Sequence, residues 1–371
     1  MVPAKASPLL GLSVEELAQL IEDAGQPHYR AEQLFEALYA QRVEELEQIT
    51  TLPQDFRRFL GEEGFIAGQP AVKQKFVSAD GTIRYLMMFG DGESAETVWM
   101  PEGDDGETGD GSEAGDTMEH TWGRATVCVS SQVGCAVDCR FCLTALLGVK
   151  RNLTAGEIVG QVLAVLNDRD VSPPQERVNL VFMGMGEPFL NYDNFMKAVR
   201  LLVDGVGIPE SRMTVSTAGV VPRIYDFASE AVRPKLAISL NASNDELRTR
   251  LMPLNRKWDL GKLMAAARDF PLRNREKLTF EYVLLDQVND SEKNACEVVE
   301  LVRGLRVKVN LIALNPGPGV DFQTPVQQRV LNFQKILIAA GIPTFVRRPR
   351  GRDIYAACGQ LKRTVELQSV T

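Results

Sequence analysis

The sequence SSQVGCAVDCRFCLTA, residues 130–145, places Cys135, Cys139 and Cys142 in a C-x3-C-x2-C array. A closed tetrahedral zinc site and a fully ligated iron–sulfur cluster both use four protein ligands. Two arrangements are therefore compatible with the three thiols. In the first, Cys128, seven residues before Cys135, completes a closed zinc or iron–sulfur site. In the second, a [4Fe–4S] cluster keeps one iron open for a substrate or cofactor.

The spacing of the cysteines favours the open cluster. The amino and carboxylate groups of S-adenosylmethionine (SAM) form a five-membered chelate with a free iron. An electron from the cluster then cleaves the sulfonium and yields a 5′-deoxyadenosyl radical. The aromatic Phe141, directly before Cys142, strengthens this interpretation.

Composition excludes several classes of protein. Six cysteines in 371 residues are too few for a disulfide scaffold, and only His28 and His120 are available for histidine-dependent hydrolases. There is no run of 18 apolar residues and no signal-peptide pattern, so we expect a cytoplasmic protein without a membrane partner. The net charge of −8 equals the eight acidic residues of segment 102–120, so it does not argue against nucleic-acid binding.

The pattern along the chain predicts five segments. Residues 1–65 read as a small helical accessory domain, in which Ser13 and Glu16 form a capping box. Residues 66–101 alternate around the turn residues Asp80 and Gly81, which predicts a β-hairpin extension. An acidic flexible loop over 102–122, a core over 123–346 and a C-terminal segment over 347–371 follow.

The core alternates between short apolar strands and helical stretches. Parallel βα units are typical of this alternation, and about six of them predict a barrel or partial barrel. Functional residues are then expected at the carboxyl ends of the strands. The predicted strands are ATVCVSS, VNLVFMG, RMTVST, LAISLN, LTFEYVLL and KVNLIALN.

Six motifs occur in order around the cysteine array: VCVSSQVGCAVDCRFC, VFMGMGEPFLN, VSTAGVVP, AISLNASNDELR, VNLIALNP and RGRDIYAACGQL. Together they resemble the radical SAM adenine-C-2 RNA methyltransferases, dual-specificity enzymes that act on 23S rRNA and tRNA. The resemblance covers nearly the whole chain. It implies a partial (β/α)6-type radical SAM barrel with a small N-terminal helical accessory domain.

The resemblance also implies the cofactor-binding residues. Cys135, Cys139 and Cys142 would hold one [4Fe–4S] cluster. Any one of the implied SAM contacts, taken alone, is more often a cap or turn residue. Asn241 departs from the histidine that many relatives carry, which puts a proton-transfer role there in doubt. The implied SAM contacts are Gly186, Glu187, Ser216, Ser239, Leu240, Asn241 and Asn315.

The implied chemistry uses SAM in two roles. Cys358 would take a methyl group from one SAM, and a second SAM would supply the radical that activates this methyl for addition to adenine C-2. Cys128 would then attack the sulfur of Cys358, release the methylated base and leave a disulfide. Glu96 matches the proposed proton acceptor, although a carboxylate in such a strand is more often exposed. Cys296 matches no motif and is expected in the core.

The resemblance implies RNA and an electron donor of the flavodoxin or ferredoxin type as partners, and a monomer is expected. Arginines directly before the Cys358 motif are expected to contact phosphates. Two alternatives stay open: methylation of C-8 of the same rRNA adenine, and a non-catalytic iron–sulfur or zinc RNA-binding protein. The arginines are Arg347, Arg348, Arg350 and Arg352.

Overall fold

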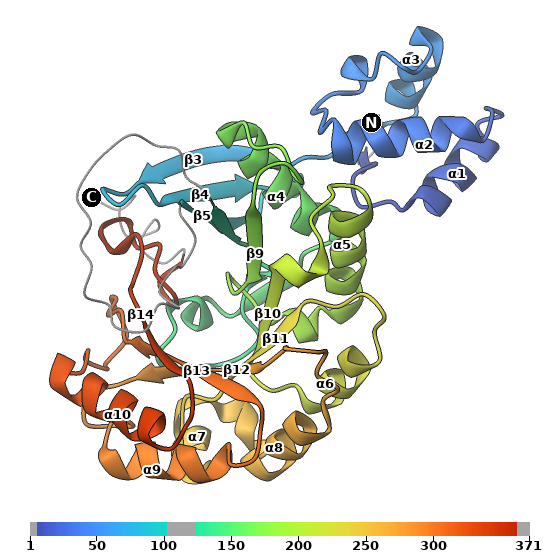
Figure 1. Cartoon of the computed structure of the whole chain (residues 1–371). Coiled ribbons are helices and arrows are strands. Elements are labelled where there is room, and N and C mark those ends of the chain that lie inside the picture. Colours follow the sequence, from blue (N-terminus) through green and yellow to red (C-terminus); the bar gives the residue numbers. More distant parts are fainter. Residues whose placement is uncertain (1–5, 102–123, 362–371) are drawn as a thin grey trace.

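The computed structural model describes residues 6–101 and 124–361, and its centre is a ten-stranded sheet that curves into a partial barrel (Figure 1). Seven parallel strands form one part of it. Six of them are the predicted ones, and the fold class predicted from the sequence is confirmed. The strands are β6 (Ala125–Cys128), β9 (Val178–Phe182), β10 (Met213–Thr217), β11 (Lys235–Ser239), β12 (Leu278–Leu284), β13 (Val307–Ala313) and β14 (Thr344–Arg347).

Helices cover the outside of this parallel part (Figure 1). In β9, Val178, Leu180 and Phe182 are buried, whereas the residues between them are half-buried. This alternation follows from the two-residue period of a strand, and it gives the barrel an apolar outer face and a more polar inner face. The helices are α4 (Ala155–Arg169), α5 (Tyr192–Asp204), α6 (Val221–Ala228), α7 (Asp245–Leu251), α8 (Leu260–Asp269), α9 (Glu292–Leu301) and α10 (Gln327–Ala339).

The predicted hairpin is continuous with the core sheet. Strands β3 (Ala71–Val77), β4 (Ile83–Met88) and β5 (Ser94–Pro101) pair antiparallel, and β5 pairs with β6 so that Val98 lies opposite Cys128. The β3–β4 turn contains Gly81 at a φ of 80°, a conformation that glycine adopts readily. The hairpin therefore forms one wall of the barrel.

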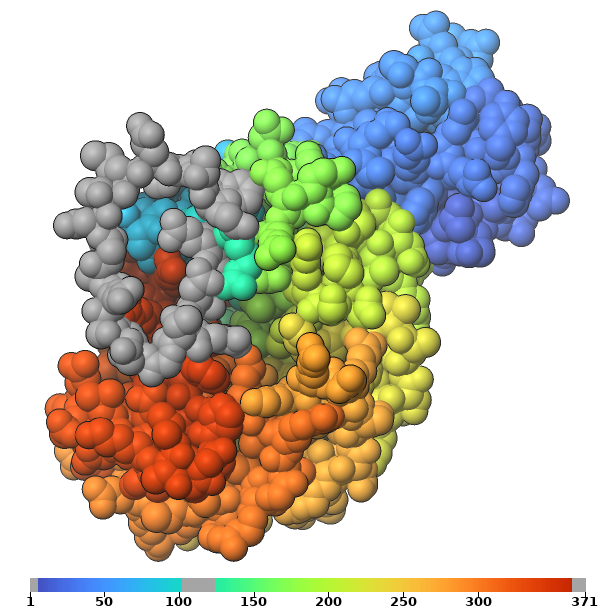
Figure 2. Space-filling view, viewed as in Figure 1, coloured from blue at the N-terminus to red at the C-terminus, as the bar shows by residue number. Residues whose placement is uncertain are grey.

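The N-terminal helices form a lobe at one corner of the molecule (Figure 2). They include α1 (Val14–Asp23), α2 (Tyr29–Phe35) and α3 (Gln54–Glu62), as the sequence predicts, and α1 begins at the predicted Ser13–Glu16 capping box. No helix in the described ranges is long and apolar enough to span a membrane. The predicted acidic loop, 102–122, and residues 362–371 lie outside the described residues.

The N-terminal lobe meets the barrel at a close contact between two backbones. Gly11, at a φ of 104°, lies against Gly156 in α4, and a Cβ on Gly156 would stand 2.1 Å from the carbonyl oxygen of Leu10. The Tyr39 hydroxyl accepts a hydrogen bond from Gly11 N and donates one to Leu12 O, both at 2.8 Å. Glycine at position 156 is thus required by the space between the two segments.

Gly156→Ala should lower the free energy of unfolding by about 1–3 kcal/mol, because the new methyl group overlaps the Leu10 carbonyl. Gly61→Ala in α3 is the matched control. A Cβ there meets nothing within 4 Å, so alanine should stabilise the helix by about 0.5–1 kcal/mol. Urea unfolding of the full chain measures both. A Gly156→Ala protein as stable as the parent would contradict this account of the contact.

Candidate active site

The cysteine loop follows two short strands, β7 (Gln132–Gly134) and its partner β8 (Val149–Asn152). Cys135 N donates to Gly148 O at 3.0 Å, and Val137 N lies 3.4 Å from the Cys135 sulfur as a donor. Cys135, Cys139 and Cys142 are half-buried. Burial raises the pKa of Cys135 to about 12 and that of Cys139 well above its usual value, and the neighbouring thiols of the array raise both further.

These three thiols suit a cluster better than a single metal ion. In the described part of the chain, no three His, Cys, Asp or Glu side chains converge to hold one ion. Each thiolate of a [4Fe–4S] cluster binds a different iron, so the three cysteines do not need to converge on one point. Their mutual electrostatic coupling places them around one shared region. The arrangement fits the predicted cluster.

The loop after β9 places Gly184, Gly186 and Glu187 beside the cysteine loop. Gly186 has a φ of 102°, and a Cβ there would stand 2.6 Å from Gln132 Cβ. Gly184 has no room for a Cβ either, because Ser130 N and Oγ would lie within 2.9 Å. Both glycines thus permit the β9 loop to pack against the loop after β6.

Glu187 is a buried carboxylate at this junction. It accepts hydrogen bonds from Ala218 N at 2.6 Å and from Phe189 N at 3.1 Å. Burial raises its pKa to about 7, while the hydrogen bonds it accepts oppose that rise. No Lys, Arg or His of the described residues forms an ion pair with it. A buried anion beside the cysteine loop is a fitting partner for the positively charged amino group of SAM.

The other predicted SAM contacts gather at neighbouring strand ends. The hydroxyls of Ser216 on β10 and Ser239 on β11 lie 3.2 Å apart. Leu240 and Asn241 are buried, and Asn241 adopts a φ of 56°, which asparagine tolerates better than most residues. The Asn241 amide oxygen accepts from Val283 N at 2.8 Å, so this side chain is used within the protein. Asn315 follows β13 and lines the adjacent cavity.

Arg248 in α7 joins these strand ends and was not singled out from the sequence. Its guanidinium is fully buried and donates to Ala218 O at 2.6 Å, Leu240 O at 3.1 Å and Ser239 O at 3.2 Å. Burial lowers its pKa to about 10, and the nearby Cys139 opposes this shift. Arg248 is the last residue of the AISLNASNDELR motif, but a helical arginine normally predicts an exposed side chain.

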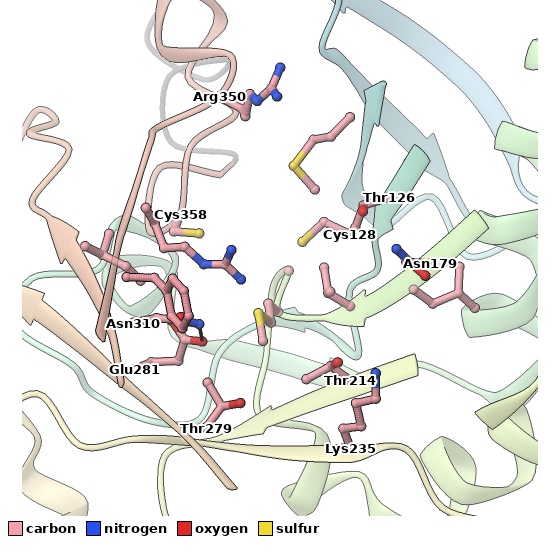
Figure 3. A pocket seen from close by; sticks show the side chains of 18 of the residues that line it. Thr126, Cys128, Asn179, Thr214, Lys235, Thr279, Glu281, Asn310, Arg350 and Cys358 are labelled. Carbon is pink, nitrogen blue, oxygen red and sulfur yellow. Dashed lines mark hydrogen bonds between the residues drawn. The ribbon is translucent and has the colours of Figure 1, made fainter. Parts of the chain in front are cut away.

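A cavity of about 820 Å³ occupies the interior of the partial barrel. Cys128, at the end of β6, and Cys358, in the C-terminal segment, both line it and face one another across it (Figure 3). Both are free thiols, and burial raises the pKa of Cys128, with a further contribution from Cys358. Cys358 is exposed at the cavity, yet desolvation by the surrounding protein raises its pKa to about 11, with a contribution from Glu281, whereas Arg347 acts in the opposite direction. The structure therefore brings together two thiols that are distant in sequence.

The Cys358 segment is tied to the β3–β4 turn. Asp353 accepts from Ser78 Oγ at 2.5 Å, and Asp80 Oδ2 accepts from Gly351 N at 3.0 Å. Next to Cys358, Gly359 O accepts from Leu143 N at 2.7 Å, which joins the segment to the cysteine loop. These contacts hold Cys358 over the open side of the barrel.

The burial of Glu96 and the exposure of Cys296 differ from what the sequence predicts. Glu96 is fully buried, not exposed, and its Oε1 accepts from Arg84 Nη1 at 2.8 Å in an ion pair. It does not line the cavity, although Val98, two residues along the same face of β5, does. Cys296 is exposed on α9, not part of the core, because its position on the helix faces outward.

Basic residues dominate the charged lining of the cavity. Three of the four arginines expected to contact phosphates line it, and Arg352 does not. The acidic lining residues are Glu276, which is paired with Arg233 at 3.1 Å, and Glu281. The basic lining residues are Arg124, Arg212, Lys235, Arg273, Arg275, Lys277, Lys308, Arg347, Arg348 and Arg350.

Comparison with known proteins identifies the family of this chain. The radical SAM superfamily matches residues 129–299, and the ribosomal RNA large subunit methyltransferase N-terminal domain matches residues 7–66. A Koribacter versatilis protein named probable dual-specificity RNA methyltransferase RlmN is 66% identical over 93% of this chain and 98% of its own. The chain belongs to the dual-specificity RNA methyltransferase family.

Two further relatives of the methyltransferase also match nearly the whole chain. A Rhodospirillum rubrum protein named dual-specificity RNA methyltransferase RlmN is 43% identical over 97% of this chain and 82% of its own. A crystal structure titled as a radical SAM methyltransferase from Sphaerobacter thermophilus superposes with a TM-score of 0.85 at 42% identity, covering 95% of this chain and 98% of that one.

Asp80→Asn should loosen the Cys358 segment of the methyltransferase. The carboxylate accepts from Thr82 N at 2.9 Å, two residues on, and from Gly351 N at 3.0 Å. The amide has one oxygen for these two donors, so one of the hydrogen bonds is replaced by two opposed donors and the turn no longer holds both groups. We expect the backbone amides of residues 351–359 to exchange with solvent about tenfold faster, since the segment would open more often. Hydrogen–deuterium exchange followed by peptide mass spectrometry measures this rate.

Asp91→Asn in the β4–β5 turn is the control for this experiment. Asp91 likewise accepts from a backbone N–H two residues on, Glu93 N at 3.0 Å, but its side-chain partner is Arg151. Its replacement should leave the exchange rate of residues 351–359 unchanged. Equal rates in both variants and the parent protein would contradict the anchoring role of Asp80.

Proposed function

We propose that the protein methylates C-2 of a specific adenine in 23S rRNA and in tRNA, through an S-methylcysteine and a covalent protein–RNA intermediate. One observation carries the proposal: Cys128 and Cys358 line one cavity, and this cavity reaches Cys142 of the three-cysteine array. Two free thiols facing across a substrate-sized space suit a carrier and a resolving nucleophile.

The three-cysteine array would hold the [4Fe–4S] cluster. The strand-end residues around Glu187, Ser216 and Ser239, with Asn315, would bind SAM. When bound, SAM would supply a methyl group in one role and, together with the cluster, a radical in the other. Arg248 positions the backbone carbonyls of this binding edge, because three of them accept its hydrogen bonds.

Cys358 acts as the methyl carrier in this proposal, and its sulfur becomes bonded first to a methyl carbon and then, through that carbon, to adenine C-2. Glu96 is the proposed acceptor of the C-2 proton, and its ion pair with Arg84 favours the ionised carboxylate that this role needs. Because Glu96 is buried outside the cavity lining, two residues before Val98, this role requires that binding of the base opens access to it. The Cys128 thiolate then attacks the Cys358 sulfur. The carbon–sulfur bond breaks and its electron pair goes to the carbon, which takes up a proton and leaves as the methyl group of the base. A disulfide remains for an external thiol to reduce.

The basic lining of the cavity supports RNA as the substrate. Such a lining attracts the phosphodiesters of RNA. The target base must leave its stack to reach thiols inside a barrel. We further propose that the enzyme acts as a monomer in the cytoplasm and receives electrons from a flavodoxin- or ferredoxin-type protein.

Mass spectrometry of digested RNA tests the function directly. The reconstituted holoenzyme, given SAM, a reductant and unmodified 23S rRNA or tRNA, should produce 2-methyladenosine. The method separates this nucleoside from 8-methyladenosine. Formation of the 8-methyl isomer would overturn the regiochemistry, and no methyladenosine together with an unmethylated Cys358 would overturn the enzymatic proposal.

A double substitution, Arg275→Ala with Lys277→Ala, should weaken RNA binding by removing two exposed cations of the lining. The slope of log affinity against log salt should fall by roughly 0.7–0.9 for each phosphate that the variant no longer neutralises. Arg268→Ala with Lys335→Ala, exposed cations on α8 and α10, is the charge-matched control. Equal salt slopes for the two double variants would contradict this RNA path.

A further inference from the structure

Glu281 is an unexpected side chain in this cavity. It lies in the middle of β12, where register places it opposite Asn310 on β13, and both side chains line the barrel interior below Cys358 (Figure 3). The Asn310 amide donates to Glu281 Oε1 at 2.8 Å. Glu281 is 8% exposed, and no ion pair within the described ranges includes it, although the positive charge of Lys308 is near enough to favour its ionised form. The other acidic lining residue, Glu276, is neutralised by Arg233.

The negative charge of a carboxylate at this position counteracts the positive charge of the rest of the lining. It repels RNA phosphates, and burying it costs free energy that a glutamine or an apolar side chain would not incur. Cross-strand packing with Asn310 does not require the charge, because an amide also accepts a hydrogen bond. The charge is therefore explained best by a ligand that donates a hydrogen bond inside the cavity.

The target base offers such a donor. The 6-amino group is the hydrogen-bond donor on the Watson–Crick edge of adenine, and N1 lies between it and C-2. A base whose C-2 faces Cys358 thus presents this edge to the walls around that thiol. Among the charged groups around Cys358, Glu281 has the largest effect on the pKa of this thiol. Burial raises the pKa of Glu281 itself to about 7.

We propose that Glu281, held by Asn310, accepts a hydrogen bond from the 6-amino group of the flipped adenine and so determines the choice of base. This inference rests on the proposed function, which supplies adenine as the substrate. Guanine carries an oxygen at this position, which places acceptor against acceptor. A site built around a hydrogen bond rejects a ligand that lacks the donor, since its buried polar group is then left unpaired.

The experiment compares two RNAs that differ in one amino group. The RNA is a tRNA with either adenosine or purine riboside, which has no 6-amino group, at the target position. Affinity is measured with reconstituted holoenzyme. We expect the parent protein to bind the adenosine RNA about tenfold more tightly. Glu281→Met, which removes both carboxylate oxygens, should bind both RNAs with the affinity that the parent shows for the purine riboside RNA.

Two controls separate recognition from structure. Thr279→Val changes another lumen residue of β12 and should keep the full tenfold discrimination. Glu281→Gln retains an acceptor and should keep part of it. A structural defect would weaken both RNAs equally in Glu281→Met and leave their ratio intact.

Two results would overturn the inference: equal affinity of the parent protein for the two RNAs, or undiminished discrimination by Glu281→Met. Formation of 2-methyladenosine by the parent is measured on the adenosine RNA in parallel. Methylation without discrimination rejects the role of Glu281 alone. Absence of 2-methyladenosine rejects the proposed function instead.

Discussion

The active arrangement depends on hydrogen bonds that hold the Cys358 segment against the barrel. On one side, Asp80 and Ser78 of the β3–β4 turn bind Gly351 and Asp353. On the other, Leu143, directly after the last cysteine of the array, donates to Gly359. Together with the hydrogen bond from Gln360 Nε2 to Pro316 O at 2.8 Å, these contacts hold Cys358 above a strand that lies early in the core. The antiparallel extension of the sheet therefore helps to position Cys358, the proposed methyl carrier.

A second constraint concerns charge around the binding edge. Glu187 is buried without a cationic side chain from the described residues, and Arg248 is buried against three backbone carbonyls. Desolvation is costly for both groups, so each needs the partners that the loops supply. The close packing at Gly184 and Gly186 holds the β9 loop, which carries Glu187, against the loop after β6. The proposed SAM-binding edge and the thiol cavity thus belong to one set of strand ends.

Much of the fold could be predicted because its signals are local. Alternating apolar residues indicated six parallel strands, and a capping box marked the start of α1. Strand β14 was missed because four residues followed by arginines give too short an apolar pattern. The burial of Glu96 could not be predicted either, since the arginine that pairs with it comes from the neighbouring strand and only the sheet register reveals it. The Asp80–Gly351 contact joins segments far apart in the chain, and no local pattern encodes it.

The central claim is that Cys135, Cys139 and Cys142 hold the cluster, whereas Cys128 resolves the covalent intermediate on Cys358. Cys128→Ala tests this claim most directly. Iron and sulfide content and RNA adducts of Cys358 are measured on the same preparation after reaction with SAM and RNA. The account predicts an intact [4Fe–4S] cluster and accumulation of a covalent Cys358–RNA adduct, because the resolving thiol is gone. Loss of the cluster in this variant, without an adduct, would show that Cys128 is a metal ligand and would contradict the account.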